Sequence, residues 1–539
     1  MAPLGKAFKY IDRFARRWMQ ECAIPGLAVG LTSREKLLEV YTYGFADAAD
    51  RTPVTPETLF EIGSLGKPFT SIALLQLRDA GKLNLNKPVS SYLPWFQVRS
   101  KFPPISVHHL MNHTGGIIRG TERSSYGLYD SWALREMEVT AAPGEYFHYS
   151  SLGYKTLGFL LEELTGRAYS EVIESRILKP LGMTQTAAVT SFETHLRTAT
   201  GYCGFYDDRP EHPSHPITPA LWEESGTGDG CQASTAQDMA IYLRMLLNRG
   251  QGLRDRVISE ECFRMMTLDG IWTGGDFYGY GLATYKDEQR TYIGHGGGNA
   301  GYRSAMVVDM EAGLGVILLV NRMGQTDPVV EAAQHCLTAL RSASRNEPLP
   351  PPRPAENSNS VPDATEYAGV YRSDERELRL IAAGAKLLMH SDLGQVALER
   401  RGADRFYIPD AEYDRFLLEF NRKDGKIVEA FHGSRWYTHE RYEGPRRFRF
   451  PQHWDAYVGH YRTRNPELSN FRVVLRKGTL ALIIPWGYSE PLHPLDRNTF
   501  RISDDPRWPE RIRFDTVVRG RGALRADYSG CPYFRAFTP

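Results

Sequence analysis

Apolar and polar residues alternate with the period of a helix at two places in the first two thirds of the chain. Residues 8–21 place aromatic and aliphatic side chains at helical spacing, with charges between them. This pattern predicts an amphipathic helix that is part of the fold. Residues 327–342 repeat the pattern and predict a second helix, packed beside the first on the same face of a sheet.

Strand-like segments lie between these two helices. Residues 26–33 and 37–46 are rich in β-branched and aromatic residues, and helical runs follow them. Residues 290–297, 302–310 and 313–321 are apolar stretches separated by turns that contain glycine. We expect these three to be adjacent antiparallel strands, so the first part of the chain is predicted to be one mixed helix-and-sheet domain.

The pattern changes after a proline-rich and polar segment, which predicts a linker over residues 346–364. Beyond it the segments are short and alternating, without a long helix. Tyr367-x-Gly369-x-Tyr371 recurs as Tyr457-x-Gly459-x-Tyr461, and residues 405–420 resemble residues 499–514. Two copies of about ninety residues predict two similar small β-barrels. The alternative is a chance likeness between two all-β segments.

These boundaries give a large domain over residues 1–345 and barrels over 365–450 and 451–539, which agrees with 539 residues being too many for one core. Charged residues are 24% of the chain and the formal net charge is +1, which argues against nucleic acid or an anionic membrane as partner. A small molecule or short peptide is the expected substrate, and the barrels are candidates for self-association.

The six cysteines are widely spaced and form no C-x-x-C pair, which predicts reduced side chains and a cytoplasmic location. No signal-peptide pattern is apparent, and no run approaches the roughly 20 apolar residues that span a bilayer.

The first candidate for chemistry is the pair Ser64 and Lys67 at the start of an apolar helical run. Residues three apart share a helix face, so the lysine amine can reach the serine hydroxyl. Pro68 fits the first turn of such a helix, whose positive end favours negative charge near Ser64. A lysine base needs a buried site with further polar partners. The alternative is a capping serine beside a surface lysine.

Two later stretches are candidates for those partners. Tyr149 precedes a predicted helix that ends at Gly166, and its phenol could shuttle a proton; the alternative is a packed tyrosine. Residues 295–298, His-Gly-Gly-Gly, predict a strand edge against which a substrate can lie. Gly296 to Gly301 match G-x-G-x-x-G, but a strand-like segment follows where a dinucleotide site needs a helix. We therefore reject the interpretation of this segment as a dinucleotide-binding site.

Several histidines precede or flank Tyr149, at positions 108, 109, 113 and 148. Their spacing matches no metal-binding motif, so we interpret them as structural. No metal or cofactor is expected.

Three motifs occur in a fixed order and resemble those of the serine β-lactamase and penicillin-binding-protein superfamily. The motifs are Ser64-x-x-Lys67, Tyr149-x-Ser151 and His295-Gly296-Gly297. The resemblance covers roughly residues 8–344. It implies an α+β domain, with an antiparallel sheet flanked by helices plus an all-helical lobe, followed here by two antiparallel β-barrels. It also implies that Ser64 is the nucleophile, that Lys67 and Tyr149 move its proton, and that the N–H groups of Ser64 and Gly298 hold the oxyanion.

Two departures from the family pattern bear on the substrate. Ser151 replaces the usual asparagine, which leaves its role open. His295 replaces the lysine that binds a substrate carboxylate, and a histidine is largely neutral at pH 7. We therefore expect a substrate without a carboxylate near the scissile bond, bound along Ser151, His295, Gly296 and Gly297.

Within the superfamily, His-x-Gly and two C-terminal barrels resemble the D-stereospecific aminopeptidases with lipocalin-like barrels. That likeness implies that a barrel loop selects a free amine, and Asp505 and Glu510 are the candidates here; a solvated acidic turn is the alternative. A carboxylesterase is the second hypothesis. A third is a receptor that is acylated but does not turn over, and a fourth assigns the function to barrels that carry a hydrophobic ligand.

Overall fold

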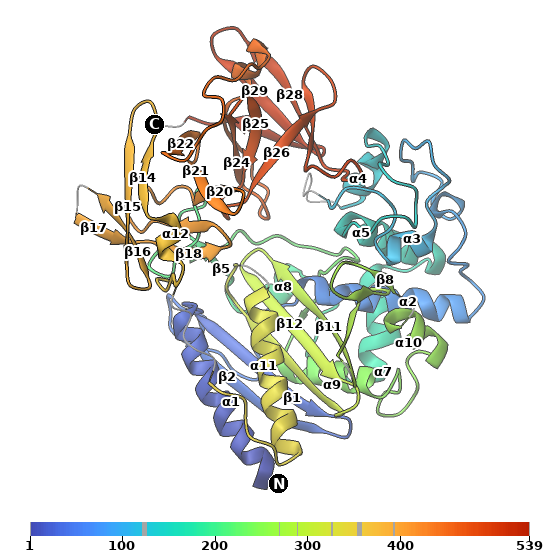
Figure 1. The fold of residues 1–539 in the computed structure, drawn as a ribbon. Helices are drawn as coiled ribbons and strands as arrows, with labels where there is room; N and C mark the ends of the chain where they lie inside the picture. The colour runs from blue at the N-terminus through green and yellow to red at the C-terminus, as the bar shows by residue number, and fades with distance from the viewer. Residues whose placement is uncertain are drawn as a thin grey trace. The chain divides into compact units, whose positions relative to one another are not determined.

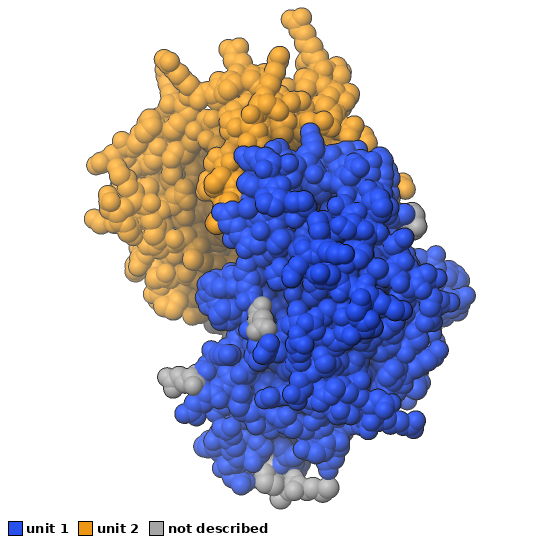
Figure 2. All heavy atoms as spheres, turned by 90° about the vertical axis from the view of Figure 1, so that its right-hand side faces the viewer, with its two compact units in different colours: residues 1–204, 217–352 blue, residues 205–216, 353–539 orange. Residues whose placement is uncertain are grey.

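The computed structural model describes residues 2–120, 127–268, 270–287, 289–324, 327–352, 358–391 and 394–537. The chain divides into two compact units, residues 1–204 with 217–352 and residues 205–216 with 353–539, which Figure 2 colours separately. Residues 353–357 of the expected linker lie outside the described residues. The predicted domain boundaries remain predictions.

The first unit is built on an antiparallel sheet (Figure 1). Within the described residues its strands are, in spatial order, β3 (Thr52–Pro53), β2 (Leu37–Asp47), β1 (Gly26–Ser33), β13 (Leu314–Val320), β12 (Tyr302–Asp309), β11 (Arg290–Asn299), β10 (Ala283–Asp287), β9 (Phe277–Tyr278) and β8 (Ile271–Trp272). The three apolar stretches predicted as neighbours are β11, β12 and β13, paired in that order.

Helices cover both faces of this sheet. Helices α1 (Ala2–Glu21) and α11 (Asp327–Ser344) lie side by side on one face (Figure 1) and share an apolar cluster with it. Helix α9 (Ala236–Leu247) covers the other face. Neighbouring residues of β13 divide between the two clusters, Leu318 in one and Leu319 in the other, because successive side chains of a strand point to opposite faces.

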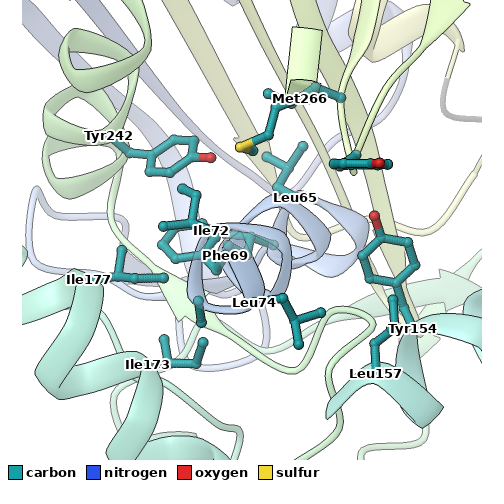
Figure 3. Packing of buried hydrophobic residues seen from close by; sticks show 14 of the residues in the cluster. Leu65, Phe69, Ile72, Leu74, Tyr154, Leu157, Ile173, Ile177, Tyr242 and Met266 are labelled. Carbon is teal, nitrogen blue, oxygen red and sulfur yellow. The ribbon is translucent and has the colours of Figure 1, made fainter. Parts of the chain in front are cut away.

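A helical lobe surrounds α2 (Lys67–Asp79), which has apolar neighbours on all sides (Figure 3). Phe69 stacks on Tyr242 with 4.6 Å between ring centroids, and Ile72, Leu74 and Tyr154 lie in the same cluster. The other helices of this unit are α3 (Val107–Met111), α4 (Gly127–Trp132), α5 (Ser151–Thr165), α6 (Tyr169–Ile173), α7 (Lys179–Leu181), α8 (Phe192–His195) and α10 (Glu260–Thr267), with helical turns η1 (Gly63–Gly66), η2 (Val89–Ser91), η3 (Ala133–Glu136) and η4 (Glu174–Leu178). The burial of α2 among these apolar side chains fixes the position of Lys67, the first residue of the helix.

Two small two-stranded antiparallel sheets also belong to the first unit. Strand β4 (Phe60–Glu61) pairs with β7 (Ala233–Ser234) directly before η1. Strand β5 (Tyr202–Gly204) pairs with β6 (Ile217–Pro219), so residues 205–216 leave the first unit and return to it at a paired stem.

The second unit contains both expected antiparallel barrels. Strands β23 (Gly459–Arg462), β24 (Asn470–Arg476), β25 (Thr479–Ile483), β26 (Ser489–Pro494), β27 (Thr499–Ile502), β28 (Arg511–Val518), β29 (Gly522–Tyr528) and β30 (Cys531–Arg535) form a closed barrel. The preceding sheet runs β17 (Gly394–Ala397), β16 (Lys386–Ser391), β15 (Glu377–Ala383), β14 (Gly369–Arg372), β22 (Arg435–His439), β21 (Lys426–His432), β20 (Leu418–Lys423), β19 (Arg405–Tyr407) and β18 (Glu399–Gly402).

This preceding sheet is also nearly closed, because its two edge strands follow each other in the chain with only Leu398 between them. A short helical segment precedes the first strand of each barrel in the chain: α12 (Ala364–Tyr367) before β14 and η5 (Gln452–Ala456) before β23. In the first barrel the Tyr371 hydroxyl donates to the Tyr367 carbonyl at 2.8 Å, and Tyr461 donates to Tyr457 at 2.8 Å in the second. The repeated motif thus makes the same hydrogen bond in both copies.

Residues 205–216 contact both barrels, an arrangement that the sequence did not predict. Arg209 pairs with Asp414 of the first barrel at 2.8 Å. Asp207 pairs with Arg462 of the second barrel, and its carbonyl accepts from Asn470 at 2.8 Å. The segment therefore joins the two barrels through charged and polar groups.

Among the helices of the described residues, none combines the length and the apolar character that crossing a membrane requires.

Candidate active site

Ser64 lies in η1, immediately before α2, at the helix start that the sequence predicted. The turn is tight because Gly63 has φ +53, a left-handed conformation that an L side chain rarely adopts. Pro68 lies in the first turn of α2, where a missing N–H costs no hydrogen bond. The positive end of the buried helix is thereby directed at the Ser64 hydroxyl.

The Lys67 amine is fully buried and has three hydrogen-bond partners in the described structure. Nζ lies 2.9 Å from Ser64 Oγ, 3.2 Å from Ser151 Oγ and 2.7 Å from the Asp229 carbonyl oxygen. The carbonyl can only accept, so one N–H is committed to Asp229. When the amine is neutral, its lone pair can take the Ser64 proton while the other hydrogen bonds hold it in place.

Tyr149 lies between this amine and the sheet. Its ring is 5.0 Å from Lys67 Nζ, and it contacts the rings of His113 and His295 with centroid separations of 4.3 and 6.1 Å. Helix α5 begins two residues later, capped by Ser150, whose Oγ accepts from Gly153 N at 3.0 Å. Tyr149 therefore directly precedes the capping residue of a well-anchored helix.

His113 accepts hydrogen bonds from the residues on both sides of Tyr149. Its carbonyl accepts from His148 N at 2.8 Å, and its Nδ1 accepts from Ser150 N at 3.0 Å. Burial and the charge of Lys67 lower the pKa of His113 well below its ordinary value, so the ring is neutral. A neutral His113 that holds the backbone of residues 148 and 150 is compatible with the structural role that we predict for it.

The glycine-rich strand β11 runs directly against η1. A Cβ on Gly63 would lie 2.5 Å from Gly298 N, and a Cβ on Gly297 would overlap the Ile62 carbonyl and the Ser304 hydroxyl. Ser304 Oγ donates to that Ile62 carbonyl at 2.7 Å, which fastens the turn to β12. The glycines are therefore needed so that the backbone of the strand can approach the nucleophile's turn.

His295 is the first residue of this glycine run. Its Nδ1 lies 2.5 Å from the Gly296 carbonyl and its Nε2 lies 2.9 Å from the Tyr278 hydroxyl. Burial and the charge of Lys67 lower the pKa of His295 to about 4. The ring is thus neutral near pH 7, as expected from the sequence.

A buried carboxyl group, that of Glu61, lies three residues before Ser64 and is only 7% exposed. Asn299, the residue after Gly298, donates from Nδ2 to Glu61 Oε2 at 2.8 Å and to the Gly230 carbonyl at 3.3 Å. Burial raises the pKa of Glu61 to about 7, against hydrogen bonds from Asn299 and Trp222 that lower it. Glu61 and Asn299 join three segments behind the nucleophile's turn.

The structure therefore brings Ser64, Lys67, Tyr149 and Ser151 together beside the strand of His295 to Gly298. Asp505 and Glu510 belong to the second unit, between β27 and β28, where Asp505 pairs with Arg507 at 2.9 Å and Glu510 is buried. Their role in substrate binding stays a prediction, as do the oxyanion donors.

Three contributors to this cluster were not identified from the sequence: Tyr278, the Asp229 carbonyl and Glu61. A backbone carbonyl has no sequence signal, and Tyr278 lies on a two-residue strand within a glycine-rich stretch. Glu61 had one available signal, a charge inside an otherwise apolar segment next to the nucleophile.

In the part of the chain that the structure describes, no three His, Cys, Asp or Glu side chains are grouped so that they could hold a metal ion.

Comparisons with known proteins show what the chain is similar to. A family model described as Beta-lactamase matches residues 11–339. Protein flp of Staphylococcus aureus is 26% identical over 350 residues, covering 62% of this chain and 67% of its own. Protein Rv1367c of Mycobacterium tuberculosis is 29% identical over 321 residues, covering 51% of this chain and 79% of its own.

Among solved structures, the octameric penicillin-binding protein homologue from Pyrococcus abyssi matches with a TM-score of 0.57 and 23% identity. The match covers 80% of this chain and 99% of that one. At this identity the likeness shows a shared fold. The family model spans more than half of the chain, and the chain therefore belongs to the Beta-lactamase family.

Proposed function

We propose that this protein is a serine hydrolase that forms a covalent acyl-enzyme on Ser64 and releases N-terminal amino acids, D-residues in particular, from peptides, amides or esters. The observation that carries the proposal is the 2.9 Å separation of Ser64 Oγ and the fully buried Lys67 Nζ, with the Tyr149 ring 5.0 Å from that amine. A capping serine beside a surface lysine would not have this burial.

The reaction has two halves. Lys67, with Tyr149, takes the Ser64 proton while Oγ attacks the substrate carbonyl carbon. The N–H groups of Ser64 and Gly298 hold the tetrahedral oxyanion, each contributing about 2.7 to 4 kcal/mol by analogy with other sites. Tyr149 returns the proton to the leaving amine or alcohol as the C–N or C–O bond breaks. Water then attacks the acyl-enzyme and frees the acid and Ser64.

The neutral His295 supports a substrate without a carboxylate beside the scissile bond. We include Ser151, His295, Gly296 and Gly297 in the substrate-binding surface. Asp505 and Glu510 remain candidates for pairing with the free amine of the substrate. A soluble, cytoplasmic enzyme is our corresponding proposal for its location, and self-association is compatible with a structural neighbour described as octameric.

Initial rates on matched L- and D-alanine anilides, nitrophenyl acetate and a chromogenic cephalosporin test the proposal. We expect preference for the D-anilide, and Ser64→Ala should abolish turnover while leaving the thermal unfolding temperature nearly unchanged. Turnover of esters alone would favour a carboxylesterase. Full activity of Ser64→Ala would refute the assignment of the nucleophile.

A further inference from the structure

The hydroxyl of Tyr278 lies among three residues of the site. It is 2.9 Å from His295 Nε2 and 3.3 Å from His113 Nε2, and it interacts with the Tyr149 phenol, whose ring lies edge-on to the Tyr278 ring at a centroid separation of 6.1 Å. Tyr278 is on β9, and Ala283 of β10 pairs with both Tyr278 and Gly294 of β11. The tyrosine thus reaches across one intervening strand, about 4.8 Å per strand step, to the histidine beside Gly294.

The protons of this network can be assigned from the partners. Ser150 N–H donates to His113 Nδ1, so the neutral His113 ring carries its proton on Nε2 and donates to the Tyr278 oxygen. The Gly296 carbonyl can only accept, so His295 carries its proton on Nδ1 and Nε2 is an acceptor. Tyr278 must therefore donate its hydroxyl hydrogen to His295 in the resting site.

The Tyr278 hydrogen has a second acceptor within reach, the Tyr149 oxygen. While Tyr149 is protonated it can donate to Tyr278, and the Tyr278 hydrogen stays on His295. When Tyr149 gives up its proton, its oxygen becomes a stronger acceptor than a neutral imidazole, because hydrogen bonds to charged groups are about twice as strong as neutral ones. The hydroxyl then turns towards Tyr149.

We propose that Tyr278 is a positioning residue of the hydrolase, whose hydroxyl hydrogen moves from His295 to the Tyr149 oxygen when Tyr149 is deprotonated. No bond to a heavy atom breaks in this step; the O–H bond rotates and one hydrogen bond replaces another. The inference rests on the proposed function, because it assigns a role within the same proton transfer.

Burial raises the pKa of Tyr278 well above its ordinary value, so this phenol remains a donor and does not compete as a base. Both histidines are neutral, and among the described residues the basic side chains over the Tyr149 ring are Lys67 and Arg119, at 5.0 and 5.8 Å from its centroid. In the part of the chain that the structure describes, the titratable and charged groups that face Tyr278 or Tyr149 are Lys67, His113, Arg119, Tyr154, Asp276 and His295.

The test is the pH dependence of kcat/KM for nitrophenyl acetate hydrolysis. Tyr278→Phe removes the hydrogen-bond donor to the Tyr149 oxygen, so the deprotonated form of Tyr149 is less favoured. The acidic limb of the profile should therefore move to higher pH by about one unit. We also expect kcat to fall about tenfold while KM changes little. His295→Phe removes the competing acceptor, so the limb should move in the opposite direction, to lower pH.

Tyr280→Phe is the matched control, because this buried tyrosine is two residues away and its hydroxyl is bonded to His108 Nδ1 at 2.7 Å. It should retain the wild-type profile. A wild-type profile in Tyr278→Phe, or shifts of the same sign in both variants, would overturn the inference. If Tyr278→Phe does not fold, the direction of the His295→Phe shift decides.

Ser64→Ala separates this inference from the proposed function. Loss of hydrolysis in Ser64→Ala with an unshifted Tyr278→Phe profile would refute only the role of Tyr278. Hydrolysis that survives Ser64→Ala would refute the proposed function itself.

Discussion

Lys67 shows how burial determines the chemistry of a single side chain. An amine without solvent contact has to be satisfied by protein groups, and among the described residues these are two hydroxyls and a backbone carbonyl. The arrangement also explains Ser151. Its hydroxyl is short enough to approach the amine, and it holds Lys67 in addition to any contact with substrate.

Glu61 offers a prediction at the residue scale. Because burial raises the pKa of Glu61 to about 7, the folded protein retains the carboxyl proton up to about that pH, whereas the unfolded chain loses it near the ordinary pKa of 4.5. The native state therefore binds more protons between these pH values, and the stability contributed by this group is lost as pH rises through that window. Glu61→Gln should remove this loss, which is at most about 3 kcal/mol.

Urea unfolding of wild type and Glu61→Gln at pH 5 and pH 8 measures the effect. We expect the variant to gain on wild type as pH rises. Parallel stability curves for the two proteins over this range would contradict the pKa assigned to Glu61.

The sequence was informative about residues whose chemistry is local and silent about those whose partners are distant. Ser64 and Lys67 are three positions apart on a helix, so their contact follows from helical geometry. Tyr278 and Asp229 are far from Ser64 and Lys67 in sequence, and only the folding of the chain brings them to the cluster. Neither position carries a periodic or spacing signal that could have predicted the contact.

At the scale of elements, the site depends on the close approach of η1 to β11. Hydrophobic patterning predicted the strand, its two neighbours and the helices α1 and α11. The short strands β8 and β9 were not predicted, because two residues are too few to show an alternating pattern. The glycines of β11 indicated close packing, and the structure identifies the turn of Ser64 as what packs there.

Gly297→Ala tests that approach. The added Cβ would overlap the Ile62 carbonyl, which is backbone and cannot move without shifting the turn of Ser64. We expect kcat/KM to fall by about 100-fold or more, because small displacements of reacting groups have effects of this size. Gly5→Ala is the control, since its Cβ would meet nothing within 4 Å. Steady-state kinetics that are equal for the two variants would contradict this account.

At the scale of the whole molecule, residues 205–216 make the second unit discontinuous in sequence. The repeat of Tyr367 and Tyr457 predicted two similar barrels, and the structure contains them. The contact of residues 205–216 with the barrels was not predicted, because a polar segment between two short strands resembles an ordinary surface loop. Its partners, such as Asp414 and Asn470, are remote in sequence.

Arg209→Ala should destabilise the second unit. The guanidinium contacts Asp208 at 2.9 Å and Asp414 at 2.8 Å, and all three side chains are largely buried. Removing the cation leaves two carboxylates without it, which we expect to cost about 1 to 3 kcal/mol. Lys423→Ala, at the exposed end of β20, is the control. Thermal unfolding of the full chain should show a lower transition only for Arg209→Ala; identical transitions would argue against a stabilising role for the insertion.

The central claim is that Ser64 becomes acylated, and acid-quenched mass spectrometry measures this most directly. After brief mixing with nitrophenyl acetate, we predict that wild-type protein carries one acetyl group on the peptide that contains Ser64, that the adduct decays on the timescale of turnover, and that Ser64→Ala carries none. An adduct that persists long after the substrate is consumed would indicate a receptor. Turnover without an adduct at Ser64, or an equal adduct in Ser64→Ala, would contradict the proposed mechanism.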